Sequence, residues 1–117
     1  RIDTDTDQLR WARGYDHTYI LDKELGKLAI ASRCSSPKTG IVMEVYTDQP
    51  GVQLYTGNWM SGNLRGKHDH RYPARAALCL ETQHYPDSPN KPEYPSTRLN
   101  PGETFRSTTI FRFTLEA

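Results

Sequence analysis

The sequence has little cysteine, little net charge and no long apolar run, and each shortage narrows the possible functions. Its two cysteines, Cys34 and Cys79, lie too far apart for a zinc motif and are too few for a disulfide scaffold. A formal net charge of +1 provides no field for holding a polyanion, so we expect no nucleic-acid partner. No apolar stretch approaches the ~18 residues of a membrane helix, so we expect no membrane partner.

Signals for secretion are also missing. The first twenty residues, RIDTDTDQLRWARGYDHTYI, contain neither the apolar centre of a signal peptide nor an initiating methionine. This predicts a mature, trimmed or partial chain. No Asn-x-Ser/Thr acceptor occurs. We therefore expect a cytoplasmic protein in which Cys34 and Cys79 are reduced, and one disulfide remains an alternative for a secreted chain.

Several motifs of catalysis and cofactor binding are absent. There is no glycine-rich phosphate loop and no Gly-x-Ser-x-Gly elbow. His68 and His70 resemble a metal-binding pair, but Lys67 and Arg71 flank them and no third ligand stands nearby. A solvated loop tip is the better interpretation. We expect no metal and no cofactor.

The pattern that is present is the two-residue period of β-strands. The strand candidates are residues 18–21, 28–32, 41–47, 52–56, 77–83 and 108–115. No window sustains a helical period. In the last candidate, Phe111, Phe113 and Leu115 alternate with polar positions, which predicts a half-buried strand with one face inward. The chain is expected to be all-β, a sandwich or part of one, and is long enough for a core of its own.

One segment is expected to be irregular, and the structure of another segment is left undecided by the sequence. Prolines recur between residues 85 and 101, at positions 86, 89, 92, 95 and 101, and exclude a regular strand or helix there. Long loops of this kind are usually functional or form a wall. Residues 1–7 carry an acidic alternation, which fits either an edge segment or a cut through something larger.

Two carboxylates are candidates for chemistry. Glu81 ends the apolar run of residues 76–80, where partial loss of water would raise its pKa toward the range of a general acid or base. A solvent-facing strand glutamate is the plainer alternative. Asp16 follows Gly14 and Tyr15 and is suited to accept hydrogen bonds from sugar hydroxyls, or else to bond its own backbone in a turn.

Three ordered stretches together resemble a known family. They are Gly14-Tyr15-Asp16-His17, then residues 49–58 (QPGVQLYTGN), then Leu80-Glu81-Thr82-Gln83 with the following YPD and Asn90. The chain is similar to the C-terminal portion of the galactose mutarotases, or aldose 1-epimerases, from about Gly14 to Phe113. The resemblance implies that residues 1–117 form the C-terminal portion of one large antiparallel β-sandwich domain, a galactose mutarotase-like supersandwich, whose N-terminal portion is absent from this chain.

The resemblance also implies the activity and its residues. Family members interconvert the α and β anomers of free aldoses such as galactose and glucose by acid–base ring opening and closure, without metal or nucleotide. The catalytic base falls on Glu81, and sugar-binding positions fall on Asp16 and Gln53. The catalytic acid is a histidine in the preceding part of the family. The implied partners are therefore an aldose and the remaining N-terminal portion of the enzyme, in the same or a separate chain.

Other functions stay open at this point. A non-catalytic sugar-binding or regulatory module on the same fold would have no need of a base at Glu81. A hexose-phosphate epimerase would use an arginine cluster, for which Arg71, Arg75 and Arg98 are available. By itself the chain is expected to be inactive and prone to aggregate, because missing strands would leave sheet edges and apolar surface exposed.

Overall fold

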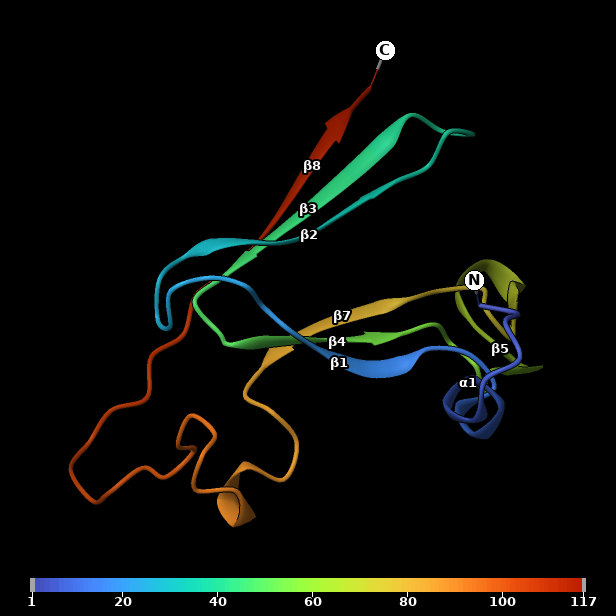
Figure 1. Cartoon of the computed structure of the whole chain (residues 1–117). Helices are drawn as coiled ribbons and strands as arrows, with labels where there is room; N and C mark the ends of the chain where they lie inside the picture. Colours follow the sequence, from blue (N-terminus) through green and yellow to red (C-terminus); the bar gives the residue numbers. More distant parts are fainter. Residues whose placement is uncertain (1, 117) are drawn as a thin grey trace. The chain divides into compact units, whose positions relative to one another are not determined.

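The structure, a computed structural model, describes residues 2–116. Its elements are α1 (Asp7–Ala12), β1 (Asp16–Ile20), β2 (Ala29–Ser35), β3 (Ile41–Thr47), β4 (Gly51–Tyr55), β5 (Ser61–Arg65), η1 (Lys67–Asp69), β6 (Arg71–Pro73), β7 (Cys79–Gln83), η2 (Ser88–Asn90) and β8 (Thr109–Leu115). The strands form three sheets, ordered β1-β4-β7, β2-β3-β8 and β5-β6 (Figure 1). The all-β class expected from the sequence is confirmed.

The described chain divides into two compact units. The first contains residues up to 18 and residues 53–81, and the second contains residues 19–52 and those from 82 onward. None of the helices in residues 2–116 has the length and apolarity needed to cross a bilayer.

The sheet β2-β3-β8 belongs to the second unit and is antiparallel throughout. Its central strand β3 is rich in β-branched residues, which suit a strand with a neighbour on each side. Val42, Val45 and Thr47 of β3 are almost completely buried. β8 pairs along the whole of β3, from Ile41 opposite Leu115 to Thr47 opposite Thr109. These pairings place the best-packed part of this unit at the middle strand.

The last strand is confirmed, but the expectation that it is half-buried is wrong. The side chains of Phe111, Phe113 and Leu115 are 49%, 64% and 76% exposed. Strand alternation puts these three on one face, as expected, yet β8 lies at the edge of its sheet and these three side chains remain largely exposed within residues 2–116. The core is correspondingly small. Among the described residues, the buried hydrophobic side chains are Val42, Val45 and Val52.

A short helix, α1, occupies part of the N-terminal segment, where the sequence predicted none. Thr6 caps it by accepting a hydrogen bond from the Leu9 N–H at 3.4 Å, and Asp7 places a negative charge in its first turn. The helix ends at Arg13, which has a left-handed backbone. The acidic alternation therefore leads into a cap and a helix, rather than an edge strand.

The hairpin of β5 and β6 was also missed. Its connection contains η1 and carries the His68-Asp69-His70 stretch, all of it exposed. This agrees with the solvated loop tip expected for those residues. Asp69 forms an ion pair with Arg65 rather than joining a ligand cluster.

The proline-rich segment runs as a long irregular loop between β7 and β8 (orange in Figure 1). The only helical element described within it is the three-residue η2, so the expectation of an irregular segment is correct in the main. Tyr85 and Tyr94 pack edge to face, with ring centroids 5.2 Å apart. The Ser88 hydroxyl donates to the Tyr85 carbonyl at 2.6 Å, which fixes the start of the loop.

Candidate functional site

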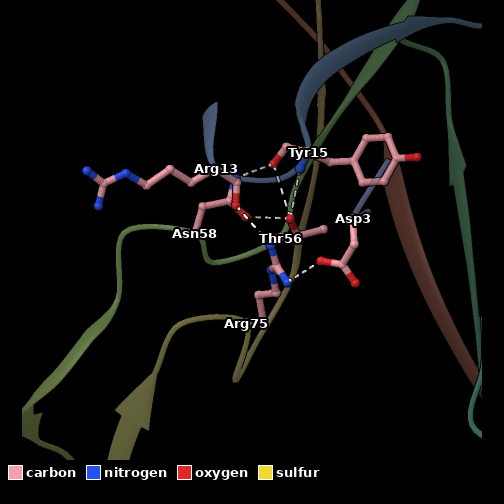
Figure 2. Close-up of polar contacts among 6 residues, drawn as sticks. All are labelled: Asp3, Arg13, Tyr15, Thr56, Asn58 and Arg75. Atoms are coloured by element: carbon pink, nitrogen blue, oxygen red, sulfur yellow. Dashed lines mark hydrogen bonds and ion pairs between the residues drawn. The ribbon is translucent and has the colours of Figure 1, made fainter. Parts of the chain in front are cut away.

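The backbone just before Asp16 is locked to the end of β4 (Figure 2). The Tyr15 N–H donates to the Thr56 hydroxyl at 3.0 Å, and the Asn58 amide donates to the Tyr15 carbonyl at 2.8 Å. Thr56 in turn donates to the Asn58 side-chain oxygen at 2.6 Å. Gly14 has φ +144°, and a Cβ there would lie 2.2 Å from that oxygen. Only glycine fits this position, and Asp16 therefore starts β1 at a fixed place.

Arg75 holds the segment that precedes this junction between the start of β1 and the end of β4. Its guanidinium donates to the Asp3 carboxylate at 2.9 Å and to the Arg13 carbonyl at 3.3 Å (Figure 2). The Arg13 guanidinium lies over the Trp59 ring at 4.5 Å from its centroid. Arg75 is therefore engaged in holding the backbone, which makes it a poor candidate for the phosphate-binding arginine cluster considered above.

Asp16 and Gln53 contact each other directly. The Gln53 amide nitrogen donates to the Asp16 carboxylate at 2.7 Å, and the Thr18 hydroxyl donates to the Gln53 side-chain oxygen. Asp16 and Thr18 share one face of β1 because they are two residues apart, and Gln53 reaches that face from β4, the next strand of the sheet. Nothing in the sequence beyond this spacing indicated a role for Thr18.

His17 also helps to hold Asp16 in place. Its ring Nδ1 accepts a hydrogen bond from the Asp16 backbone N–H at 3.0 Å. Its Nε2 lies 3.0 Å from the Gln8 side-chain oxygen and donates to it, since Nδ1 already acts as acceptor. The ring also packs edge to face on Tyr15. Both ring nitrogens are thus occupied, and His17 helps to position Asp16.

Glu81 lies on β7, which neighbours β4 in the same sheet as Asp16 and Gln53. Its side chain is exposed. The sequence led us to expect a Glu81 carboxylate partly removed from water. Within residues 2–116 it is instead exposed to solvent. Within residues 2–116 no hydrogen bond joins the Glu81 side chain to that of Asp16 or Gln53. The structure brings two of the three expected residues into contact and places the third on the adjoining strand.

A separate cavity of about 630 Å³ lies in the second unit. It is lined by Gln49, Thr82, Gln83, His84, Ser96, Thr97, Arg98, Leu99, Phe105 and Ser107. On its wall the Gln49 side-chain oxygen accepts a hydrogen bond from His84 Nδ1 at 2.9 Å, and the Gln49 amide nitrogen donates to the Ser107 hydroxyl at 3.0 Å. Burial raises the pKa of the nearby Asp48, but hydrogen bonds from Gln49, the Thr108 backbone and Ser107 outweigh it and hold that pKa below its usual value.

The described residues form no cluster of side chains suited to bind a metal ion. No group of three or more His, Cys, Asp or Glu side chains in residues 2–116 is arranged to hold an ion.

Comparison with known proteins decides the family. The family model described as aldose 1-epimerase matches residues 1–112. The chain belongs to the aldose 1-epimerase family. Galactose mutarotase from Mus musculus is 46% identical over 102 residues, and that from Homo sapiens is 44% identical over the same length; each match covers 87% of this chain. Aldose 1-epimerase from Escherichia coli K12 is 35% identical over 113 residues, or 94% of the chain.

Two further features of these matches matter. The chain spans about 30% of the length of the curated relatives it matches. A solved structure, the GalM/aldose epimerase homologue from C. elegans, superposes with a TM-score of 0.75 at 26% identity, covering 86% of this chain and 30% of that one. The resemblance and the fold inferred from the motifs are thereby confirmed.

Within this aldose 1-epimerase chain the motif residues separate into two groups. The first group, Gly14, Thr56 and Asn58, makes its contacts within the group and with the Tyr15 backbone. These residues therefore build the junction. Asp16 and Gln53 retain hydrogen-bonding capacity beyond their mutual hydrogen bond, because a carboxylate has several acceptor sites and an amide has both donor and acceptor sites. Of these motif residues, Asp16 and Gln53 are the ones that keep polar groups available to a ligand.

Proposed function

We propose that this chain supplies the base and two sugar-binding residues of an aldose 1-epimerase acting on free hexoses such as galactose or glucose. The observation that carries the proposal is the hydrogen-bonded pair of Asp16 and Gln53 beside the strand of Glu81, in a chain of this family. Relatives named galactose mutarotase, at 42–46% identity, support the choice of substrate class.

In the proposed reaction Glu81 removes the proton from the C1 hydroxyl while an acid protonates the ring oxygen. The C1–ring oxygen bond breaks and gives the open-chain aldehyde. Rotation about C1–C2 turns the carbonyl, and the ring then closes on the other face as both proton transfers reverse. The Asp16 carboxylate accepts hydrogen bonds from hydroxyls, and the Gln53 amide can donate and accept at once, which suits neighbouring hydroxyls.

We further propose that the acid is a histidine outside this chain. His17 has both ring nitrogens engaged, by Asp16 and Gln8. His84 is bonded to Gln49, in the second unit. His68 and His70 lie exposed in the β5–β6 connection. With the base but no suitable acid, the 117 residues alone are expected to be inactive.

The partner that brings this acid would be the remaining polypeptide of the enzyme. The apolar face of Phe111, Phe113 and Leu115 supports this, as does the length of the relatives, of which this chain spans about 30%. Burying one such side chain contributes about 1.5–3 kcal/mol, so covering this face would favour association strongly.

We also propose a cytoplasmic location. Cys34 and Cys79 are both free, and Cys79 is exposed. An exposed free thiol is more readily maintained in a reducing compartment than in an oxidising one.

Polarimetry on freshly dissolved α-galactose tests the function. The enzyme that carries this chain should speed the change in optical rotation, and Glu81→Gln should lower kcat by about 10²–10⁴-fold, the range of a lost acid–base group. The sugar dissociation constant should change little. The matched control is Glu93→Gln, the same change at an exposed glutamate of the proline-rich loop.

Three results would count against these proposals. Full activity of the Glu81→Gln enzyme would remove Glu81 as base. Sugar binding without catalysis by the wild-type enzyme would favour a binding module. Sustained mutarotation by the isolated 117 residues would contradict an acid supplied from outside the chain.

A further inference from the structure

Thr18 is the third member of the polar group formed by Asp16 and Gln53. We propose that Thr18 is a positioning residue for the sugar site: its hydroxyl holds the Gln53 amide in the orientation that presents one N–H and one oxygen lone pair to the substrate. This inference rests on the proposed function, because it assigns Gln53 to sugar binding. The contact itself is a property of the fold.

The donors and acceptors of the three residues allow one arrangement. A carboxylate only accepts, so the Gln53 nitrogen must face Asp16, as the 2.7 Å contact has it. The Gln53 oxygen then faces Thr18, whose hydroxyl donates to it. Turning the amide over would set its oxygen against the Asp16 carboxylate, and two acceptors repel. Asp16 therefore selects the orientation of the amide, and Thr18 holds its other end.

What is left over on Gln53 is what a sugar can use. An amide has two N–H groups and two oxygen lone pairs, and Asp16 and Thr18 take one of each. Gln53 and Thr18 are half-buried while Asp16 is exposed. The Thr18–Gln53 hydrogen bond is thus the better protected of the two, and Asp16 lies where a ligand can reach it.

Without the Thr18 hydroxyl, Gln53 would be tethered at one end only. Binding would then have to order the amide, which weakens affinity without touching the reacting atoms. A lost neutral hydrogen bond corresponds to about three- to tenfold in a binding constant. The effect should fall on KM, because the contact is the same in the ground state and the transition state.

The test compares Thr18→Val, which keeps the shape and removes the hydroxyl, with Thr18→Ser, which restores it. In the mutarotation assay Thr18→Val should raise KM about three- to tenfold with kcat unchanged, and Thr18→Ser should return KM toward wild type. Thr114→Val, the same change at an exposed position of β8, is the control and should leave KM unchanged.

A second measurement does not depend on catalysis. In the whole enzyme with this chain ¹⁵N-labelled, the Gln53 side-chain amide, assigned through its loss in Gln53→Glu, should become mobile in Thr18→Val and stay restricted in Thr18→Ser. An unchanged amide signal together with an unchanged KM would overturn the proposal. So would equal losses of kcat in the Val and Ser variants, since that pattern indicates a merely structural role. If the wild-type enzyme shows no mutarotation, the proposed function fails, while the amide signal still decides the contact.

Discussion

Substituting Gly14 by alanine should damage the junction that positions Asp16. The new methyl would lie 2.2 Å from the Asn58 side-chain oxygen and 3.0 Å from the Thr56 hydroxyl. Asn58 is 6% exposed, so its side chain has little room in which to move away. Moving it would break its hydrogen bonds to Thr56 and the Tyr15 carbonyl.

The size of the effect follows from two contributions. A non-glycine residue at φ +144° carries strain of about 1–3 kcal/mol. Displacing a buried amide from its partners costs about another 1–3 kcal/mol. A total near 4 kcal/mol is a large part of the 5–15 kcal/mol that typically separates folded from unfolded chains. With a slope of about 1.5 kcal/mol per M, the urea midpoint would fall by about 2–3 M.

Urea unfolding followed by tryptophan fluorescence measures this change, because Trp11 and Trp59 both lie in the unit that contains Gly14. Gly62→Ala is the matched control. Gly62 also has a positive φ, +74°, but its nearest neighbour, Pro73, is at an ordinary 3.5 Å, so only strain of about 1–2 kcal/mol is expected.

A double variant separates the clash from the strain. Asn58→Ala removes the atoms that Gly14→Ala would strike, so the two together should cost clearly less than the sum of the single changes. The reasoning is refuted if Gly14→Ala costs no more than Gly62→Ala, or if the two changes are additive.

Two further predictions concern the second unit. The pKa of Asp48 is lowered in the folded chain, so its contribution to stability should be complete above the unfolded value near 4 and lost as the pH falls through the folded value. Amide exchange of β3 and β8 in acid should show this loss, and Asp48→Asn should abolish its pH dependence; an unchanged acid profile would contradict it. Phe113→Ser should weaken association with the remaining polypeptide of the enzyme, the partner proposed above, about 10- to 100-fold, as measured by co-purification or calorimetry. Thr114→Ser, on the opposite face of the strand, should have little effect, and equal losses from both changes would argue against docking through the apolar face.

The strands that the sequence predicted well are those whose signal is local. β3 and β8 contain long β-branched and aromatic runs, and their limits differ from expectation by at most one residue. β5, with sequence SGNLR, has no such run and becomes a strand through pairing with β6. α1 is too short to display a period, and its cap at Thr6 together with the left-handed Arg13 defines it instead.

Alternation indicated correctly which residues of β8 share a face, but not whether that face is covered. Coverage depends on what lies opposite in space, and no pattern within one strand contains that information. For the site, too, the sequence identified residues but not the contacts between them. The motifs identified Asp16 and Gln53, whereas their hydrogen bond joins residues 37 apart, and the contact with Thr18 depends on the neighbouring order of β1 and β4.

The strand order β1-β4-β7 has a consequence for how the chain folds. β2 and β3 are joined by a short turn and can pair early, whereas β1 can meet β4 only after the intervening segment, which contains that hairpin, has closed into a loop. Asp16 and Gln53 therefore come together through one of the slower contacts of the chain. The Gln53–Asp16 hydrogen bond should therefore form late in refolding, and intermediates in which only the local hairpin has formed should lack the proposed sugar site.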